Sequence, residues 1–191
     1  SDSAKKTQSV NTLLKKDNGV FGYNTDSIGF KSTLFKKNEY EKNDNFKYLI
    51  IGAGGVTSSI IDGIGRADKI YVTNRTRHKL DELKKKFTQI EIVDWGDKPP
   101  ECDMVINTTS VGLAENENLK IDFHNYRNNK RALFYDVIYN PKETNFLKNA
   151  KSRGNKIMNG QMMFLYQAQA SFKLWTNLNP EISEEVIKLI D

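Results

Sequence analysis

The segment that decides the fold is Phe46–Gly55, FKYLIIGAGG, in which a short apolar run leads directly into glycines. The run predicts a buried strand, and the isoleucines spaced over residues 60–64 predict a helix after the glycines. Gly52 permits the sharp turn, and Gly54 lets a bound group approach the backbone. The helix N-terminus then offers N–H groups, so the segment predicts a phosphate site. A strict G-x-G-x-x-G motif would place its third glycine at Thr57, so a glycine-rich turn without function is the alternative.

Strands and helices are predicted to alternate along the rest of the chain. Strands are expected at 69–73, 90–93, 103–107, 134–139 and 156–158, and helices at 77–86, 144–153, 161–175 and 184–190. This alternation predicts a parallel sheet covered on both faces. Upstream, a hairpin is expected over 10–23, then a helix capped by Thr25 or Asp26 and an exposed loop at 36–45. The predicted fold class is α/β, a Rossmann-like doubly wound parallel sheet with C-terminal helices.

Composition excludes several classes of protein. Of 191 residues, 38% are hydrophobic and 28% charged, and no run approaches the roughly 20 apolar residues of a membrane helix. The net charge of +5 comes from scattered lysines, so we expect neither a membrane nor a nucleic-acid partner. The single cysteine, Cys102, is expected to be a packing residue of a cytoplasmic protein. We expect no metal site, because His78 and His124 lack partners at ligand spacing and are predicted to lie at the surface.

The residues after the strand at 69–73 indicate which dinucleotide would bind. An NAD site usually carries an acidic side chain there, which accepts hydrogen bonds from the ribose 2′-hydroxyl. This chain has Asn74, Arg75, Thr76 and Arg77 instead. Two guanidinium groups can hold a 2′-phosphate, which a carboxylate would repel. The sequence therefore predicts NADP as the cofactor. The alternative is that Arg75 and Arg77 are solvated residues at the start of the next helix.

Several segments, taken together and in order, resemble shikimate dehydrogenases. They are VNTL at 10–13, YNTDSIGF at 23–30, IGAGGV at 51–56, NRT at 74–76, INTTSVGL at 106–113, DVIYNP at 136–141, NGQMMFLYQA at 159–168 and FKLWT at 172–176. The resemblance implies a substrate domain and a Rossmann-type NADP domain on either side of a cleft. It also implies reduction of 3-dehydroshikimate to shikimate by NADPH, a step of aromatic amino acid biosynthesis.

The resemblance also implies roles for single residues. Asn11 and Gln167 would hydrogen-bond the substrate hydroxyls, and Tyr139 would lie near the substrate carboxylate. Asp26 would be the partner of a catalytic lysine and would also contact a substrate hydroxyl. The expected cofactor residues are Gly52, Gly54, Gly55, Val56, Asn74, Arg75, Thr76, Arg77 and Thr108, with Gly160 and Met163 near the nicotinamide. Without the surrounding motifs, Asp26 is explained as a helix cap, and Gln167 lies on an apolar stripe where its amide needs a partner.

The resemblance divides the chain into three parts. Residues 1–25 would be a remnant of the substrate domain, 26–159 the NADP-binding domain, and 160–191 helices that pack on the substrate domain. The Ser-x-Ser motif and the lysine-bearing V-T-x-P-x-K-like segment of the family have no counterpart before Val10. We therefore expect a fragment that binds NADP but turns over little substrate alone. Its C-terminal helices would expose an apolar face that promotes homo-oligomers, made of Phe164, Leu165, Phe172, Leu174 and Trp175.

Two other functions remain open from the sequence. One is a quinate/shikimate dehydrogenase that uses NAD. The other is a non-catalytic NADP-binding module. The lack of the lysine segment favours the second, whereas Asn11, Asp26 and Gln167, which are useful only toward a substrate, disfavour it.

Overall fold

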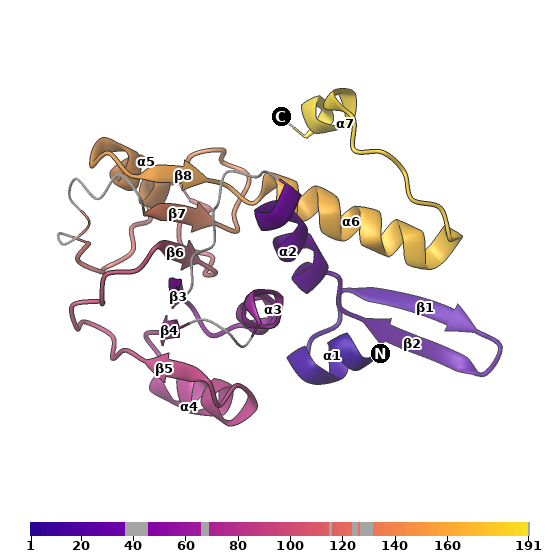
Figure 1. Cartoon of the computed structure of the whole chain (residues 1–191), viewed down its shortest axis with the longest axis horizontal. Helices are drawn as coiled ribbons and strands as arrows, with labels where there is room; N and C mark the ends of the chain where they lie inside the picture. The colour runs from indigo at the N-terminus through magenta and orange to yellow at the C-terminus, as the bar shows by residue number, and fades with distance from the viewer. Residues whose placement is uncertain (37–45, 66–68, 115, 124–125, 127–131, 191) are drawn as a thin grey trace. The chain divides into compact units, whose positions relative to one another are not determined.

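The computed structural model describes all residues except 37–45, 66–68, 115, 124–125, 127–131 and 191 (Figure 1). The described residues fall into two compact units. Unit 1 is drawn from Ser1–Glu41, Ser58–Ile64 and Gln161–Asp191, and unit 2 from Lys42–Thr57 and Gly65–Gly160. Unit 1 contains a two-stranded sheet and unit 2 a six-stranded sheet.

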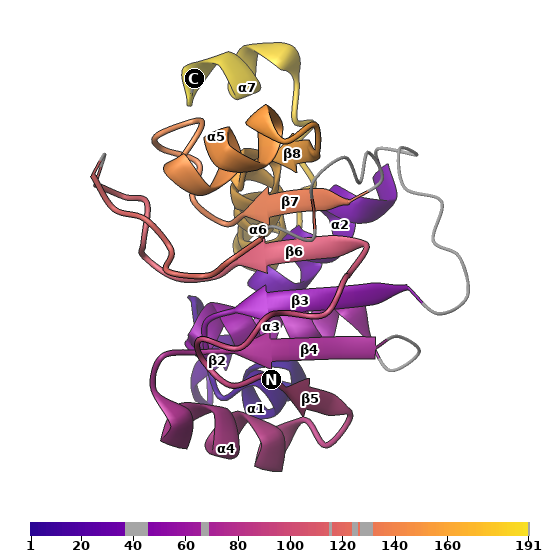
Figure 2. The same cartoon turned by 90° about the vertical axis from the view of Figure 1, so that its left-hand side faces the viewer.

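Unit 2 is built on a parallel sheet with the strand order β5-β4-β3-β6-β7-β8 (Figure 2). The strands are β3 (Lys47–Ile51), β4 (Lys69–Thr73), β5 (Ile90–Ile92), β6 (Met104–Asn107), β7 (Leu133–Asp136) and β8 (Lys156–Met158). All residues of β6 and β7 are buried, as expected for central strands of a parallel sheet. Helix α4 (Arg77–Lys86) packs on β5, and α5 (Asn145–Ser152) packs on β7 and β8. The predicted α/β fold with a Rossmann-like parallel sheet is confirmed.

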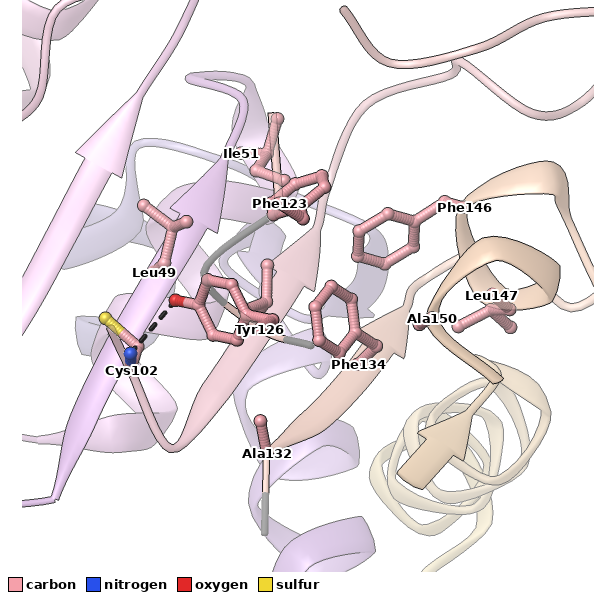
Figure 3. Packing of buried hydrophobic residues seen from close by; sticks show 11 residues of the cluster. Leu49, Ile51, Cys102, Phe123, Tyr126, Ala132, Phe134, Phe146, Leu147 and Ala150 are labelled. Carbon is pink, nitrogen blue, oxygen red and sulfur yellow. Dashed lines mark hydrogen bonds between the residues drawn. The ribbon is translucent and has the colours of Figure 1, made fainter. Parts of the chain in front are cut away.

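An aromatic cluster forms much of the core of unit 2 (Figure 3). The ring of Phe134, on β7, lies 5.5 Å from Phe123 and 5.4 Å from Tyr126, both edge to face. Phe146 of α5 is tilted against Phe134 at 5.3 Å. Aromatic pairs of this geometry each contribute about 0.5–1.5 kcal/mol beyond the burial of their surface. The cluster therefore holds α5 against β7.

Cys102 lies in the same core, where its backbone N–H donates a hydrogen bond to Tyr126 Oη at 2.9 Å (Figure 3). The Tyr126 hydroxyl in turn donates to the carbonyl oxygen of Pro100 at 2.7 Å. Burial raises the pKa of the Cys102 thiol to about 12, so the thiol stays protonated. The prediction that Cys102 is a packing residue is confirmed. His78 is exposed, also as predicted, and His124 lies outside the described residues.

Unit 1 combines a hairpin with helices from both ends of the chain. Its elements are α1 (Asp2–Thr7), β1 (Thr12–Lys16), β2 (Gly19–Tyr23), α2 (Asp26–Lys36), α6 (Gln161–Thr176) and α7 (Glu184–Leu189). Helix α2 packs on α6, and Gly29 permits the close approach, because a Cβ there would lie 2.6 Å from the carbonyl oxygen of Met163. Helix α3 (Gly55–Ile64) begins in unit 2, and its later turns belong to unit 1, where Ser59 Oγ donates to Asn24 Oδ1 at 3.1 Å.

Most predicted elements are found within two residues of their expected bounds. The strand predicted at 134–139 is shorter, because β7 ends at Asp136, whose side chain accepts the N–H of Ile138 at 3.0 Å in place of a neighbouring strand. Helix α1 was not predicted; the Ser1 side chain caps it by accepting from the N–H of Ala4. The exposed loop predicted at 36–45 lies, apart from its first residue, outside the described residues.

The predicted apolar face of the C-terminal helices is only partly exposed. Leu165 is buried at 7% exposure, so its inclusion in that face was wrong. Phe172 and Trp175 are exposed at 40% and 56%. No helix among the described residues is both long and apolar enough to cross a bilayer.

Candidate functional site

A cavity of unit 2 lies where three strands of its sheet end. Strands β4 and β6 flank β3 on opposite sides, so the direction of winding reverses beside β3. At such a point the loops after neighbouring strands diverge and leave a crevice at the carboxyl edge of the sheet. Here those loops line a cavity of 540 Å³. Six of the predicted cofactor residues line it: Gly52, Gly54, Asn74, Arg75, Thr76 and Thr108. Gly55 and Val56 lie in the first turn of α3, next to the glycine turn.

The two glycines that line the cavity are required for different reasons. Gly52 has a φ of 120°, and a Cβ on it would lie 2.4 Å from Thr108 Oγ1. The fold therefore requires glycine at position 52, whether or not a ligand is bound. A Cβ on Gly54 would meet no atom within 4 Å, so Gly54 leaves open space in the cavity. That space is where the backbone can approach a bound phosphate group.

Thr57 occupies the position of the missing third glycine, and its hydroxyl fastens the turn. Thr108 Oγ1 donates its only proton to the carbonyl oxygen of Ile51 at 2.8 Å. In the 2.7 Å contact between the two threonine hydroxyls, Thr57 must therefore be the donor. Thr57 Oγ1 also accepts from the N–H of Gly54 at 3.1 Å. This chain of hydrogen bonds ties the glycine turn to the loop after β6 and explains how a threonine replaces the glycine.

Positive charge gathers in the cavity near the end of β4. Arg75, Lys79 and Lys120 all line it, and no aspartate or glutamate is among the described lining residues. Asn74 Nδ2 donates to the carbonyl oxygen of Thr76 at 3.0 Å, which shapes the chain as it enters α4. Sequence reasoning missed Lys79. The available signal was its spacing, three residues after the helix N-cap Thr76, which returns it to the same side of the helix.

Arg77 points to other partners. Its Nε donates to Asp81 Oδ1 at 3.1 Å, and its guanidinium also pairs with Asp94. Both carboxylates raise the pKa of Arg77 above its ordinary value. Arg77 is not among the residues that line the cavity. The cations that line the cavity are therefore Arg75, Lys79 and Lys120. Lys120 and Trp95 are further lining residues that sequence reasoning missed.

Two further predicted residues of unit 2 lie in or near the loop after β7. Tyr139 is half-buried in that loop. Gly160 is buried, and its N–H donates to the carbonyl oxygen of Ile138 at 3.1 Å. A Cβ on Gly160 would lie 2.0 Å from the carbonyl oxygen of Val137, so no other residue fits there. The segment ending at Gly160 is thus held directly against the segment that carries Tyr139.

In unit 1, polar side chains from three parts of the chain meet in a polar cluster, which comprises Asn11, Thr25, Asp26, Gln167 and Ser171. Asn11 Nδ2 donates to Asp26 Oδ1 at 2.8 Å and to Thr25 Oγ1 at 2.9 Å. It also reaches Gln167 Oε1 at 3.4 Å. Ser171 Oγ lies 3.0 Å from Thr25 Oγ1. The structure therefore brings three predicted substrate residues, Asn11, Asp26 and Gln167, into one hydrogen-bonded group.

Asp26 is the titratable member of the polar cluster. Burial raises the pKa of its carboxyl group, and the hydrogen bond from Asn11 opposes that effect. Its backbone N–H donates to Asn24 Oδ1 at 3.0 Å, at the start of α2. No described lysine is hydrogen-bonded to the Asp26 carboxylate. A half-buried carboxyl group with a raised pKa is suited to proton transfer or to a cationic partner.

Two further features of unit 1 are the position of Met163 and a second cavity. Met163, expected near the nicotinamide, is buried in α6 at 6% exposure. A cavity of 580 Å³ lies between the hairpin, α2 and α6, and is lined by Thr25 but not by Asn11, Asp26 or Gln167. Lys16 and Lys173 are among its lining residues. In the part of the chain that the structure describes, no three His, Cys, Asp or Glu side chains are grouped to hold a metal ion.

The cavity of unit 2 fits a phosphorylated dinucleotide on three counts. Gly54 leaves backbone open to an anion. The first turn of α3 carries no acidic residue to repel one. Arg75 and Lys79 supply positive charge at the end of β4, where a 2′-phosphate would lie.

Comparisons with known proteins agree with these features. The family model for shikimate / quinate 5-dehydrogenase matches residues 35–151. A shikimate dehydrogenase (NADP(+)) from Pelagibacter ubique is 50% identical over 193 residues, which cover 100% of this chain and 71% of the relative. Among solved structures, a shikimate dehydrogenase in complex with NADP+ has a TM-score of 0.85 and 30% identity, over 98% of this chain and 67% of that chain. The enzyme from Thermus thermophilus, in complex with NADP(H) and shikimate, has a TM-score of 0.84 and 28% identity, over 100% and 72%.

The predicted resemblance is therefore confirmed over the whole length of this sequence. The match covers about 70% of the length of the relatives, which are longer. On the parallel sheet, the cavity at its switch point and these relatives, the chain belongs to the shikimate dehydrogenase family.

Proposed function

We propose that this chain acts in the NADP-dependent interconversion of 3-dehydroshikimate and shikimate, and that unit 2 binds the NADP(H). The observation that carries the proposal is the cavity at the switch point. A glycine turn and the cations of Arg75 and Lys79 face one space that has no carboxylate among its described lining residues. The Pelagibacter relative is named as an NADP(+)-dependent shikimate dehydrogenase, and the Thermus enzyme holds both NADP(H) and shikimate.

The residues of unit 2 suit the charged parts of NADP(H). The N-terminus of α3 would receive the pyrophosphate, because the helix dipole and its first N–H groups favour an anion. Arg75 and Lys79 would hold the 2′-phosphate, with Asn74 and Thr76 shaping the loop beside it. When bound, NADPH supplies the hydride. The protein binds it, orients it and excludes water.

The polar cluster of unit 1 suits a ligand with several hydroxyl groups. A hydroxyl donates one hydrogen bond and accepts others, and the cluster offers the amides of Asn11 and Gln167 and the carboxylate of Asp26. We assign these three residues to the substrate hydroxyls. Tyr139 is assigned to the substrate carboxylate and Met163 to the nicotinamide side, on the family motifs in which they stand.

Ketone reduction also requires a proton at the new hydroxyl group. Asp26 is placed to hold a cationic proton donor, yet no described lysine is hydrogen-bonded to it. Loss of a general acid typically slows a reaction by about 10² to 10⁴-fold. We therefore propose that this chain by itself binds NADPH but turns over little or no shikimate.

The domain organisation also remains our proposal. Residues 1–25 would be a remnant of a substrate domain, 26–159 would form the NADP-binding domain, and the helices of 160–191 would pack on the substrate domain. The exposure of Phe172 and Trp175 supports an association surface that forms homo-oligomers. The single buried thiol of Cys102 supports a reducing, cytoplasmic location. The scattered lysines support the expectation that nucleic acid is not a partner.

Titration calorimetry of the full chain with NADP+ and NAD+ tests the proposal. Because NADP+ adds a charge-assisted contact worth about 1.5–3 kcal/mol, we expect it to bind at least tenfold more tightly than NAD+. No heat with either dinucleotide, or equal affinities, would overturn the assignment. Formation of NADPH from shikimate by the same sample should stay near background.

A further inference from the structure

Asp136 is a fully buried carboxylate that belongs neither to the cavity lining of unit 2 nor to the polar cluster. It ends β7, directly beside Asn107, which ends β6 and is also fully buried. None of the ion pairs between described residues includes Asp136. A buried carboxylate is costly unless hydrogen bonds compensate for the lost water. The contacts of Asp136 therefore need a functional or structural reason.

Three donors converge on this carboxylate. Oδ1 accepts from Asn107 Nδ2 at 3.1 Å and from the N–H of Ile138 at 3.0 Å. Oδ2 accepts from Thr144 Oγ1 at 2.6 Å. Thr144 also caps α5 by accepting from the N–H of Leu147 at 3.4 Å. Since an ionised carboxylate only accepts, it satisfies all three donors at once.

On one side, Asp136 accepts from the Asn107 amide and helps to hold it in place. Because Asp136 accepts, the NH₂ end of Asn107 must face it, and the same NH₂ group donates to the carbonyl oxygen of Val111 at 3.1 Å. The oxygen end then accepts from the N–H of Thr109 at 3.0 Å and from its hydroxyl at 2.7 Å. Thr109 and Val111 both line the cofactor cavity. The carboxylate thus fixes one wall of that cavity through Asn107.

On the other side, Asp136 holds the loop after β7. Its bond to the N–H of Ile138 lies one residue before Tyr139. The carbonyl oxygen of Ile138 accepts from the N–H of Gly160. Thr144, the third donor, lies at the far end of the same loop. Both ends of the segment that carries Tyr139 are therefore tied to one carboxylate.

We propose that Asp136 is a positioning residue that couples the cavity wall at Thr108–Val111 to the loop at Val137–Thr144. Loss of its bond to Thr144 then alters NADPH binding, although Thr144 does not line the cavity. This inference rests on the proposed function, because NADPH is the ligand that reports it.

The test compares Thr144→Val with Thr144→Ser in the full chain. The valine keeps the shape but removes the hydroxyl that bonds to Asp136, and the serine keeps the hydroxyl. We expect Thr144→Val to weaken NADPH affinity about five- to tenfold in calorimetry, as for the loss of a typical buried hydrogen bond. Thr144→Ser should stay within about twofold of the unmodified chain, by the same reasoning. Asp136→Asn should weaken binding as well, because an amide has a single oxygen and cannot accept at both ends of the side chain as the carboxylate does.

The matched control is Thr33→Val in unit 1. Thr33 is a buried threonine whose hydroxyl donates to a backbone oxygen, that of Gly29, at 2.9 Å. Its loss should lower stability without changing NADPH affinity. NMR shifts of the Thr109 and Val111 amides add a readout without ligand, and they should move in Thr144→Val but not in Thr33→Val.

Equal NADPH affinity in Thr144→Val, Thr144→Ser and the unmodified chain would overturn the inference. If the unmodified chain binds no NADPH, the proposed function fails instead, and the amide shifts decide the coupling alone. Unmoved Thr109 and Val111 amides in Thr144→Val would then refute it.

Discussion

The two units hold their functional residues together in different ways. In unit 2, the cavity is lined by the segments that follow β3, β4 and β6, together with Trp95 after β5. In unit 1, the polar cluster joins Asn11 to Gln167, 156 residues away, and Thr25 to Ser171, 146 residues away. The cavity is thus set by sheet topology and a few backbone positions. The polar cluster depends on the packing of α2 on α6 and on each side chain.

In unit 2, we expect the largest loss of stability from a substitution at one backbone position, Gly52. Gly52→Ala should lower the free energy of unfolding of unit 2 by about 2–4 kcal/mol, since it adds an overlap with Thr108 to a strained positive φ. Denaturant unfolding followed by Trp95 fluorescence, with Trp175 replaced by Phe, reports this unit. Gly54→Ala is the control and should change stability little, because its Cβ would meet open space. A loss below about 1 kcal/mol in Gly52→Ala would show that the turn can relax.

The second prediction concerns the pH dependence of unit 2. Burial raises the pKa of Asp136 to about 6, so between pH 4 and 6 the folded state binds a proton there that the unfolded state has released. The contribution of Asp136 to the free energy of unfolding therefore falls as pH rises through this window, by up to about 3 kcal/mol. Unfolding curves of the unmodified chain and of Asp136→Asn between pH 4 and 7 give the difference in slope. Parallel pH profiles would contradict a raised pKa.

The third prediction separates the cations near the end of β4. Arg75→Ala and Lys79→Ala should each weaken NADPH binding about 10- to 100-fold, because each removes a charge-assisted contact to the 2′-phosphate. Affinity for NADH should not change. Arg77→Ala is the matched control, since Arg77 is held by Asp81 and Asp94 outside the cavity lining. Equal losses in Arg77→Ala and Arg75→Ala would place the phosphate elsewhere.

The difference between the two units also explains which features could be predicted from the sequence. The strand at 69–73, the helix at 77–86 and the glycine turn are local, and their patterns predicted them correctly. Asn11, Asp26 and Gln167 were connected only through the family motifs, because no local pattern brings residues 156 positions apart together. The end of β7 at Asp136 was missed because a side chain, and not a turn residue, accepts the N–H of Ile138.

Lys79 and Arg77 show that the sequence alone could not predict which basic side chains line the cavity. Both are basic residues near the start of α4, but only Arg77 was predicted from the sequence to be a cofactor residue. Helical rotation instead brings Lys79 to the cavity, while nearby Asp81 and Asp94 capture Arg77. Which cation reaches a ligand depends on competing carboxylates, and their positions are known only after folding.

The smallest predicted effect tests the dependence of unit 1 on single side chains. Asn11→Ala should cost about 1 kcal/mol of stability by removing hydrogen bonds within the polar cluster. It should also raise the pKa of Asp26 further, because the Asn11 hydrogen bond now opposes the effect of burial. NMR titration of the Asp26 carboxyl carbon measures this shift, and Asn149→Ala on the exposed side of α5 is the control. Since the contribution of Asp26 to stability falls as pH rises through its folded pKa, the variant should extend that fall to higher pH. An unchanged pKa of Asp26 in Asn11→Ala would mean that the Asn11 hydrogen bond does not control the ionisation of Asp26. The polar cluster would then depend on its single side chains no more than the cavity of unit 2 does.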